Sequence, residues 1–405
     1  MIRFPCGLRK WCSMKIHILI ALVLFWCLPL RAQTIHAASC SQANVQTAIN
    51  SASDGDTVDI PSGGTCTYTS AVTISGKYIT LTGLGITTIN SSAQNTIHVT
   101  PTNTGTTRIT GFKFNENGVV NDNQPTVIVT GISTNTAYRI DHNTLTNTDN
   151  GTLLDVKGNG PGLIDHNTFS GGGSAEMIHN LGMQGLSTSG WTDDVIPGSA
   201  NMLFIEDNTF TQNGGGTVSH IVESYNGART VIRHNTLTMT DIDQHGTCGF
   251  IYARWWEIYG NNWVINGITS FYAHLRGGSG VVWGNTLTGT NGSGAASIQM
   301  QEDCGSLQPQ TVGGGYEPSG TRVQSPAYVW GNSSTIPIDS NFPVLNRDYF
   351  ISTNQPSTLT RCESAADQAA GCPVSYNYTP YIYPHPLQGA SSAPPPPSGL
   401  TAVVH

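Results

Sequence analysis

The residues best suited to catalysis lie between positions 223 and 276. They are two carboxylates, two imidazoles and two guanidinium groups: Glu223, Asp243, His245, His274, Arg254 and Arg276. β-Elimination at a uronic acid needs a cation that neutralises the substrate carboxylate, a base for the C5 proton and an acid for the leaving oxygen. Either arginine could be the cation, and either histidine or an arginine could be the base. Glycoside hydrolysis would instead use two carboxylates about 5–10 Å apart, for which Glu223 and Asp243 are the best pair.

Three arginines share a short sequence context. Arg229, Arg254 and Arg276 end the tripeptides Gly-Ala-Arg, Tyr-Ala-Arg and His-Leu-Arg, each at the expected end of the strand before a repeated motif. Stacked on successive turns of a repeat, they would form a basic column along one edge. Arginine binds carboxylates through two parallel hydrogen bonds, so this column would suit a uronate polymer. Alternatively, the three side chains brace turns by bonding to backbone carbonyls.

A repeated hexapeptide predicts the framework that positions these residues. Ile-Asp-His-Asn-Thr-Leu at 140–145 returns with small changes at 164–169, 205–210 and 232–237, and in degenerate form at 258–263, 282–287 and 329–332. Four of the six steps between the asparagines are 24–27 residues long, which is typical of one turn of a β-solenoid. The longer steps of 41 and 47 residues imply inserted loops or a missed turn.

The motif also predicts how each turn of the solenoid is built. An Ile before the asparagine and a Leu, Phe or Trp after it alternate with polar residues, as half-buried strands require. We expect the asparagines to tolerate the left-handed backbone of a tight turn and to form a structural ladder. The sequence therefore predicts an all-β fold, a single-stranded, right-handed parallel β-helix.

The residue two positions before each asparagine should point outward and form a column. The seven positions hold Asp141, Asp165, Glu206, Arg233, Tyr259, Trp283 and Trp330. Arg233 and the three aromatic residues of this column, together with Arg229, are predicted to bind substrate, because sugars stack on Tyr and Trp rings. The three carboxylates could hold Ca²⁺, although such a site needs about six oxygens or more. Alternatively, the column is an ordinary solvated face or lies beneath inserted loops.

Composition and charge narrow the class of protein. The chain has 405 residues, of which 38% are hydrophobic and only 10% charged, with 46 glycines, which favours strands separated by tight turns. Five of the 17 Lys and Arg residues and none of the 25 acids lie in positions 1–31, so the rest of the chain carries a net charge of −13. That charge disfavours a nucleic-acid binder that relies on phosphate contacts.

The amino terminus and the cysteines indicate export. Basic residues precede an apolar run at 16–30, so residues 1–38 are predicted to be a signal peptide, with cleavage near Ala32 or at Ala37 or Ala38. Three cysteines lie in this leader and six follow it: Cys40, Cys66, Cys248, Cys304, Cys362 and Cys372. Their neighbourhood in sequence suggests pairing of Cys40 with Cys66, Cys362 with Cys372 and Cys248 with Cys304, among fifteen connectivities. No further stretch predicts a membrane span.

The ends of the solenoid, predicted to occupy residues 39–388, need covers. Residues 41–52 place Val45, Ile49 and Ala52 on one helical face, which predicts a short helix that caps the first turn. The aromatic and proline-rich segment 376–387 is expected to cap the other end. Residues 389–398 are a predicted Pro/Ser linker, and residues 399–405 resemble the first strand of a truncated fibronectin type III module.

The repeats, the Asn-Thr-Leu/Phe signature, the helix and the Tyr-Pro-His-Pro-Leu ending at 383–387 resemble the pectate-lyase-like superfamily over about residues 40–388. This resemblance implies the fold, but it selects no activity, because the superfamily includes lyases, hydrolases, epimerases and esterases. Ile-Asp-His at 140–142 and 164–166 resembles the W-I-D-H segment of pectate lyases without its Trp. Their R-x-P-x-x-R signature is absent from the sequence, so no catalytic arginine is assigned by motif. Of the polygalacturonase motifs, only Gln244-His245-Gly246 resembles one element.

Together these features predict a secreted, monomeric polysaccharide lyase that acts on an acidic, uronate-containing glycan. Two alternatives stay open: a non-catalytic glycan-binding solenoid, and a glycoside hydrolase. Neither nucleic acid nor a membrane is expected as a partner.

Overall fold

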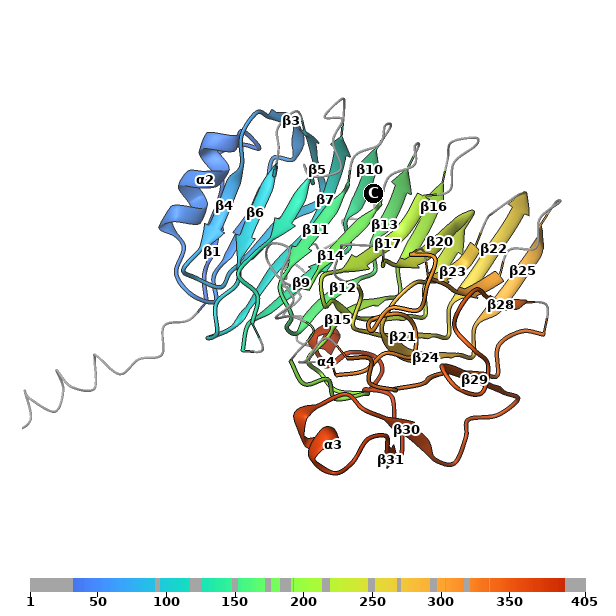
Figure 1. Cartoon of the computed structure of the whole chain (residues 1–405). Coiled ribbons are helices and arrows are strands. Elements are labelled where there is room, and N and C mark those ends of the chain that lie inside the picture. Colours follow the sequence, from blue (N-terminus) through green and yellow to red (C-terminus); the bar gives the residue numbers. More distant parts are fainter. Residues whose placement is uncertain are drawn as a thin grey trace, which may run out of the picture. The chain divides into compact units, whose positions relative to one another are not determined.

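Stacked parallel strands make up most of this computed structural model (Figure 1). The structure describes residues 32–91, 95–116, 125–133, 135–147, 152–171, 176–182, 191, 193–212, 219–246, 252–267, 271–291, 297–302, 304–316, 321–334 and 336–389. The strands follow one another in a repeating order, so that each turn of the chain contributes one strand to each of three ladders. This is the architecture of a parallel β-helix.

The first ladder contains the strand of each turn that ends with the first two residues of the repeated motif, such as Ile140-Asp141. Its members pair in parallel in this order: β1 (Thr34–His36), β2 (Thr57–Asp59), β5 (Thr80–Ser91), β7 (Thr106–Glu116), β9 (Ala137–Asp141), β12 (Gly162–Asp165), β15 (Leu203–Glu206), β18 (Arg229–Arg233), β21 (Trp255–Tyr259), β24 (Ser279–Trp283), β27 (Ala327–Trp330) and β29 (Tyr349–Ser352).

The second ladder follows directly after the asparagine of each motif. It runs through β3 (Gly64–Tyr68), the second halves of β5 and β7, β10 (Thr144–Asn147), β13 (Thr168–Gly171), β16 (Thr209–Gln212), β19 (Thr236–Thr238), β22 (Asn262–Gly267) and β25 (Thr286–Asn291).

The third ladder has no repeated sequence signature. It contains β4 (Val72–Ser75), β6 (Ile97–Thr100), β8 (Val127–Val129), β11 (Leu154–Lys157), β14 (Ile178–Leu181), β17 (Ser219–Tyr225), β20 (Thr240–Gln244), β23 (Phe271–Leu275), β26 (Ser297–Met300) and β28 (Ile338–Ser340).

Inward-pointing apolar side chains fill the space between the ladders. Equivalent residues lie in register, so that Ile140, Ile164 and Ile205 stack in the first ladder and Phe169 and Phe210 stack in the second, with ring centroids 4.7 Å apart. All five belong to one continuous buried cluster. The alternation of apolar and polar residues in the motif therefore predicted the core correctly.

The asparagine ladder is present along the corner between the first two ladders. From Asn143 to Asn332, each of the first six asparagines donates from its backbone N–H and from Nδ2 to Oδ1 of the next asparagine, at 2.9–3.1 Å. The predicted backbone position is wrong by one residue, because the left-handed conformation belongs to the residue before each asparagine. There φ is between +53° and +66°, at His142, His166, Asp207, His234, Gly260, Gly284 and Gly331. Glycine in the later copies suits this position, since it adopts positive φ without strain.

Asn235→Ala is expected to destabilise the protein by about 2–4 kcal/mol, because it removes bonds to several buried groups. Nδ2 of Asn235 donates to the carbonyls of Ile205 and Arg233 and to Asn261, while Oδ1 accepts from Asn208. Denaturant unfolding would measure the loss. Asn262→Ala is the matched control, since the neighbouring Asn262 bonds only partly exposed threonines, and it should cost less than about 0.5 kcal/mol. Equal losses for the two variants would contradict a structural ladder.

The amino-terminal part departs from the predicted boundary. Strand β1 lies within the predicted signal peptide 1–38, yet it pairs with β2 as part of the first ladder. Cleavage near Ala32 would keep this strand, whereas cleavage at Ala37 or Ala38 would remove it. Residues 1–31, including the apolar run, lie outside the described residues. Helix α2 (Gln42–Ser51) follows and buries Val45, Ala48 and Ile49 in the main cluster.

Disulfides join two of the predicted cysteine pairs. Cys40 bonds to Cys66, and Cys362 bonds to Cys372. Cys304 is disulfide-bonded as well, and its predicted partner Cys248 lies outside the described residues. Within the part of the chain that the structure describes, no helix is long and apolar enough to cross a membrane.

The carboxyl-terminal segment lies along the side of the first ladder, not over the last turn as predicted. It begins after β30 (Leu359–Arg361), α3 (Ala365–Ala369) and β31 (Val374–Tyr376), and it ends in α4 (Pro386–Gly389). Backbone carbonyls of this segment accept hydrogen bonds from Arg139 in β9 and Arg233 in β18, the strands of the first and fourth copies of the motif. The predicted linker from residue 390 and the fibronectin-like strand lie outside the described residues.

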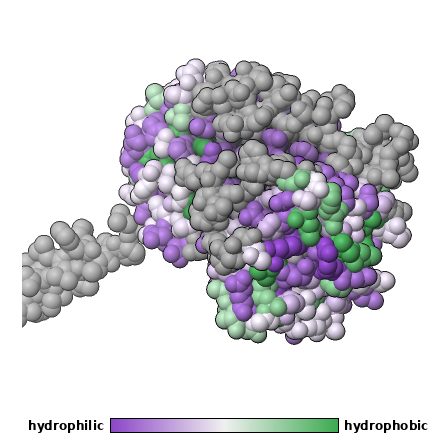
Figure 2. Space-filling model, viewed as in Figure 1, coloured by the Kyte–Doolittle hydropathy of each residue, from purple (hydrophilic) through white to green (hydrophobic). Residues whose placement is uncertain are grey.

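Surface polarity is mixed on the face shown in Figure 2, where hydrophilic residues surround smaller groups of hydrophobic ones. Large exposed hydrophobic side chains include Phe342, Val344, Leu345 and Ile351 in the last turns of the solenoid, and Ile382 and Tyr383 in the carboxyl-terminal segment.

Candidate functional site

The outer face of the third ladder gathers five of the six predicted catalytic residues. Register pairs Glu223 in β17 with Asp243 in β20, and Asp243 with His274 in β23. His245 and Arg276 each follow two residues later, so they point to the same side as Asp243 and His274. The predicted residues therefore become neighbours on three successive turns. We call Glu223, Asp243, His245, His274 and Arg276 the polar cluster.

Asp243 is the centre of the polar cluster. Its carboxylate accepts hydrogen bonds from Arg276 Nε at 3.1 Å and from Arg276 Nη2. His245 Nδ1 lies 2.6 Å from Glu223 Oε1, 2.6 Å from Arg276 Nη2 and 3.7 Å from Asp243 Oδ2. His274 Nδ1 lies 4.0 Å from Asp243 Oδ1, on the other side of the same carboxylate. Two imidazoles and one guanidinium thus converge on one buried acid.

Exposure differs between these side chains in a way that suits a reaction at the surface. The Asp243 side chain is fully buried, whereas 20% of His245 and 14% of Glu223 remain exposed. Asp243 can therefore orient its neighbours but is shielded from solvent; of the two rings beside it, His245 is the more exposed, and the His274 side chain is 10% exposed.

The two histidines have opposite pKa shifts. Burial lowers the pKa of His245, but the nearby carboxylates of Asp243 and Glu223 outweigh burial and raise it to about 9. At His274, burial dominates the attraction of Asp243, and its pKa is lower than the ordinary value of 6.5. At neutral pH the first ring is therefore protonated and the second is neutral. Pairs of groups whose pKa values are pushed apart in this way mark acid and base roles.

Both carboxylates of the polar cluster are ionised. Burial alone would raise the pKa of Asp243, but the interactions with His245 and with the charge of Arg276 hold it well below the ordinary value. Burial also opposes ionisation of Glu223, and the bond and charge of His245 again lower the pKa overall. Neither acid carries a proton at neutral pH.

The tautomer of His274 follows from its hydrogen bond. Its Nε2 lies 2.5 Å from Gln301 Oε1, an amide oxygen that can only accept. Nε2 therefore bears the proton of the neutral ring, and the lone pair lies on Nδ1, the atom nearer to Asp243.

Sequence analysis missed two histidines beside the polar cluster. His220 bonds to Asp241, and this carboxylate outweighs burial and raises the pKa of His220 to about 10. His179, one strand before Glu223, lies 3.8 Å from that carboxylate, and burial lowers its pKa. Their positions depend on strand register in the third ladder. Because that ladder has no Asn signature, its strands could not be aligned from sequence.

Arg254 lies apart from the polar cluster. The predicted arginine column is wrong, because the three arginines do not lie at equivalent positions of successive turns. Register pairs Arg229 with Trp255 and not with Arg254, whereas Arg276 follows a strand of the third ladder. Turns of different length before each arginine break the alignment. The Arg254 side chain is fully buried, bonds to Glu363 and donates from Nε to the carbonyl of Trp191 at 3.2 Å. This arrangement is that of a structural ion pair.

Arg254→Met is expected to destabilise the protein by about 3–5 kcal/mol, because Glu363 would be left buried without its cation. The folded variant should keep its turnover, since Arg254 touches none of the polar cluster in the described residues. Thermal unfolding and turnover at a temperature well below the transition would separate the two effects. A large loss of turnover in folded Arg254→Met protein would contradict a purely structural role and would support the predicted catalytic role of Arg254.

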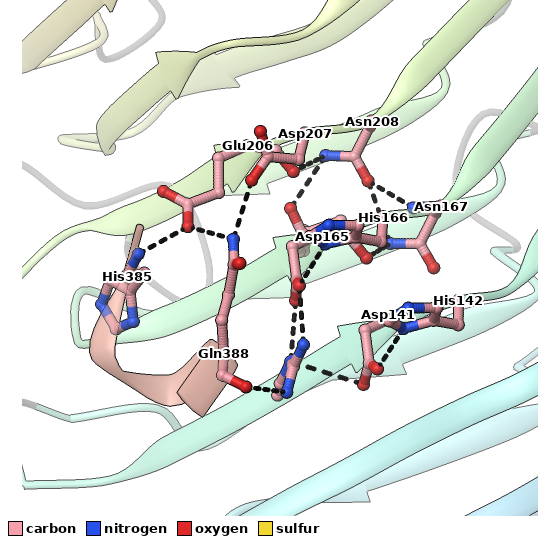
Figure 3. A network of polar contacts seen from close by, with 12 residues as sticks. Asp141, His142, Asp165, His166, Asn167, Glu206, Asp207, Asn208, His385 and Gln388 are labelled. Atoms are coloured by element: carbon pink, nitrogen blue, oxygen red, sulfur yellow. Dashed lines mark hydrogen bonds and ion pairs between the residues drawn. The ribbon is translucent and has the colours of Figure 1, made fainter. Parts of the chain in front are cut away.

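The predicted outward column has the expected register but is not an open surface. Asp141, Asp165, Glu206, Arg233 and Tyr259 lie side by side on successive strands, and all are buried. The carboxyl-terminal segment covers them, as Figure 3 shows for Glu206, whose carboxylate accepts from the backbone N–H of His385 and from Gln388 Nε2. No local sequence signal pointed to this cover, because residues 385 and 206 are far apart in the chain.

The aromatic end of the column is covered too. Tyr259 and Trp283 stack with centroids 4.5 Å apart, and Trp283 stacks on Trp330 at 5.9 Å. Tyr378 packs edge-on against Trp330 at 6.0 Å, and Tyr381 packs against the cluster that contains Tyr259. The aromatic rings therefore stack on one another, but they pack against the carboxyl-terminal segment of the chain. A sugar could reach them only if that segment moved away.

The three carboxylates predicted to hold Ca²⁺ do not fit that ion. Arg108 binds Asp141 through two hydrogen bonds, Arg139 binds Asp165 in the same way, and Arg233 bonds to Glu206. Arginines therefore already supply the positive charge. Glu223, Asp243 and His245 also have ligand atoms within 4.8 Å of one another. There, Arg276 already supplies a positive charge beside Asp243.

The polar cluster is thus the part of the described surface best arranged for chemistry. It can bind an anionic group, accept a proton at His274 and donate one from His245. Comparison of the sequence with protein-family models and with curated proteins gave no match.

Proposed function

We propose that the polar cluster catalyses β-elimination in an acidic, uronate-containing polysaccharide. The observation that carries the proposal is the convergence of two histidines and one arginine on one buried carboxylate; the pKa is raised at His245 and lowered at His274. These groups are the base, the acid and the cation that elimination needs.

His274 is the base in this proposal. Nδ1 accepts the C5 proton, and Asp243, 4.0 Å away, stabilises the imidazolium that forms. Arg276 faces the substrate carboxylate and favours the negative charge that develops as the proton leaves, while Asp243 fixes its orientation. General base catalysis of this kind contributes about 10²–10⁴-fold to the rate.

His245 is the acid. Glu223 holds Nδ1 at 2.6 Å and keeps the ring protonated near neutral pH, which leaves Nε2 to protonate the leaving oxygen. As the C4–O bond breaks, the electron pair of the C5–H bond becomes the C4=C5 double bond. One proton moves to His274 and another leaves His245, so the step is balanced without a further reagent.

Hydrolysis by Glu223 and Asp243 has less support. A glycosidase that uses a carboxylate pair needs one of them protonated as the general acid, with a raised pKa. Both carboxylates have lowered pKa values, so the pair contains no acid at neutral pH.

The rest of the proposal concerns family and location. Parallel coils and the asparagine ladder support membership in the pectate-lyase-like superfamily, with α2 as the cap of the first coil. Disulfides at Cys40–Cys66 and Cys362–Cys372 support an oxidising compartment, and hence secretion, of a monomer that binds an acidic polysaccharide.

Incubation with pectate, alginate and a glycosaminoglycan, with neutral galactan as the control, tests the function. Elimination creates a double bond conjugated to the carboxylate, which absorbs in the ultraviolet, so a rise in absorbance with one acidic polymer is expected. Reducing ends without absorbance would indicate a hydrolase, and binding without any product would indicate a glycan-binding solenoid. Either result would contradict the proposal.

A further inference from the structure

Arg229 has a buried guanidinium edge without a hydrogen-bond partner. The residue begins β18, and only 6% of its side chain is exposed. Neither Nε nor Nη2 makes a hydrogen bond. The nearest carboxylate oxygen is Asp193 Oδ2, 3.8 Å from Nη2, which is beyond hydrogen-bond distance. Asp193 is 58% exposed, so water screens this weak contact.

The other buried arginines in the described part of the chain are bonded. Arg139 and Arg233 each bond to a carboxylate and to backbone carbonyls of the carboxyl-terminal segment, and Arg254 bonds to Glu363 and Trp191. Buried donors without a hydrogen-bond partner are costly, so natural proteins rarely keep them without a reason. Arg229 is therefore the exception that needs an explanation.

The surroundings of Arg229 contain charges of both signs. Arg254 is close enough to repel it, and Glu363 is already bonded to Arg254. Burial and the charge of Arg254 lower the pKa of Arg229 to about 10, which still leaves it protonated at neutral pH. Asp193, Glu363 and Asp194 attract the guanidinium, but none of them hydrogen-bonds its Nε/Nη2 edge.

The free edge has the geometry of a carboxylate site, and this protein contains three examples of it. Arg108 donates from Nε and Nη2 to the two oxygens of Asp141, Arg139 does so to Asp165, and Arg276 does so to Asp243. The unpaired donors of Arg229 are the same two atoms. Two parallel N–H groups match the two oxygens of a planar carboxylate.

We propose that the Nε/Nη2 edge of Arg229 binds a carboxylate of the ligand, outside the polar cluster. The site itself follows from Arg229 alone, whereas its assignment to a uronate of the glycan rests on the proposed function. A polymer held here by one sugar would be anchored while another sugar occupies the polar cluster, around the corner between the third and first ladders.

Calorimetric titration of the full chain with D-galacturonate, with galactose as the neutral control and inorganic sulfate as a tetrahedral anion, tests this site. Arg229→Met should weaken galacturonate binding at this site by about 10- to 100-fold, the cost of losing a charge-assisted pair of hydrogen bonds. Arg229→Lys should weaken it less, because the charge stays but the fork is lost. Arg276→Met should leave this site intact, which separates it from any binding at the polar cluster.

Thermal unfolding gives a second readout that does not depend on turnover. Without ligand, Arg229→Met should be at least as stable as the wild type, since two buried donors without hydrogen bonds are removed. Galacturonate should raise the Tm of the wild type and of Arg276→Met but not of Arg229→Met. An unchanged rise in Arg229→Met, an equal rise with galactose, or equally tight binding of sulfate would overturn the assignment. If galacturonate binds as expected and no acidic polymer is cleaved, the proposed function fails and the site stands.

Discussion

Asp243→Asn is expected to reduce turnover by about 10³-fold or more, because three functional groups depend on this carboxylate. The amide cannot compensate the charge of Arg276, which donates two hydrogen bonds to Asp243. It also removes the main interaction that raises the pKa of His245, so this ring loses its proton nearer to neutral pH. Finally, the imidazolium that forms at His274 loses its counter-charge.

Asp339→Asn is the matched control for this variant. Asp339 lies on the same outward column of the third ladder, two strands beyond His274 and paired with Gln299, but it is exposed and is not part of the polar cluster. Its replacement should leave turnover unchanged. Initial rates of double-bond formation would measure both variants, and circular dichroism would show that each is folded. An active Asp243→Asn enzyme would remove Asp243 from the mechanism.

His274→Gln is expected to reduce turnover by about 10²–10⁴-fold, because glutamine can keep a polar contact but cannot accept the C5 proton. Substrate binding should change little, so the loss should appear in kcat and not in KM. His98→Gln is the matched control. His98 lies on the same outward column, six strands earlier, and burial also lowers its pKa.

The pH dependence of the wild type follows from the two histidines. His274 must be neutral, so activity should fall as pH drops through its pKa, which lies below 6.5. His245 must be protonated, so activity should fall again as pH rises through about 9. A bell-shaped profile with a plateau around neutral pH is expected. In Glu223→Gln the alkaline limb should shift to lower pH, because Glu223 no longer raises the pKa of His245. An unmoved limb would contradict the assignment of His245 as the acid.

The repeat made the first two ladders predictable from sequence. The Ile and the Leu, Phe or Trp around each asparagine placed the core correctly, and the asparagines form the ladder that their spacing implied. The single error there, the left-handed residue, arose because His142 and its equivalents adopt a positive φ that glycine supplies in later copies. Local sequence does carry that signal, in the change from His to Gly at 260, 284 and 331.

Contacts between distant segments were beyond prediction. Two such contacts join residues more than a hundred positions apart: Glu206 with His385 and Gln388, and Arg254 with Glu363. No periodicity in the sequence links these residues. The polar cluster was found from residue types alone, since charged residues are rare in this chain. His220 and His179 were missed because their relation to Glu223 depends on the register of strands without a signature.

Double-bond formation from a uronate polymer, compared between the wild type and His274→Gln, tests the central claim most directly. We expect the wild type to give products that absorb in the ultraviolet and are lighter by one water than the hydrolysis products, and His274→Gln to give almost none while still binding the polymer. Saturated products from the wild type, or equal rates of elimination in the two proteins, would contradict a base at His274 and with it the proposed reaction.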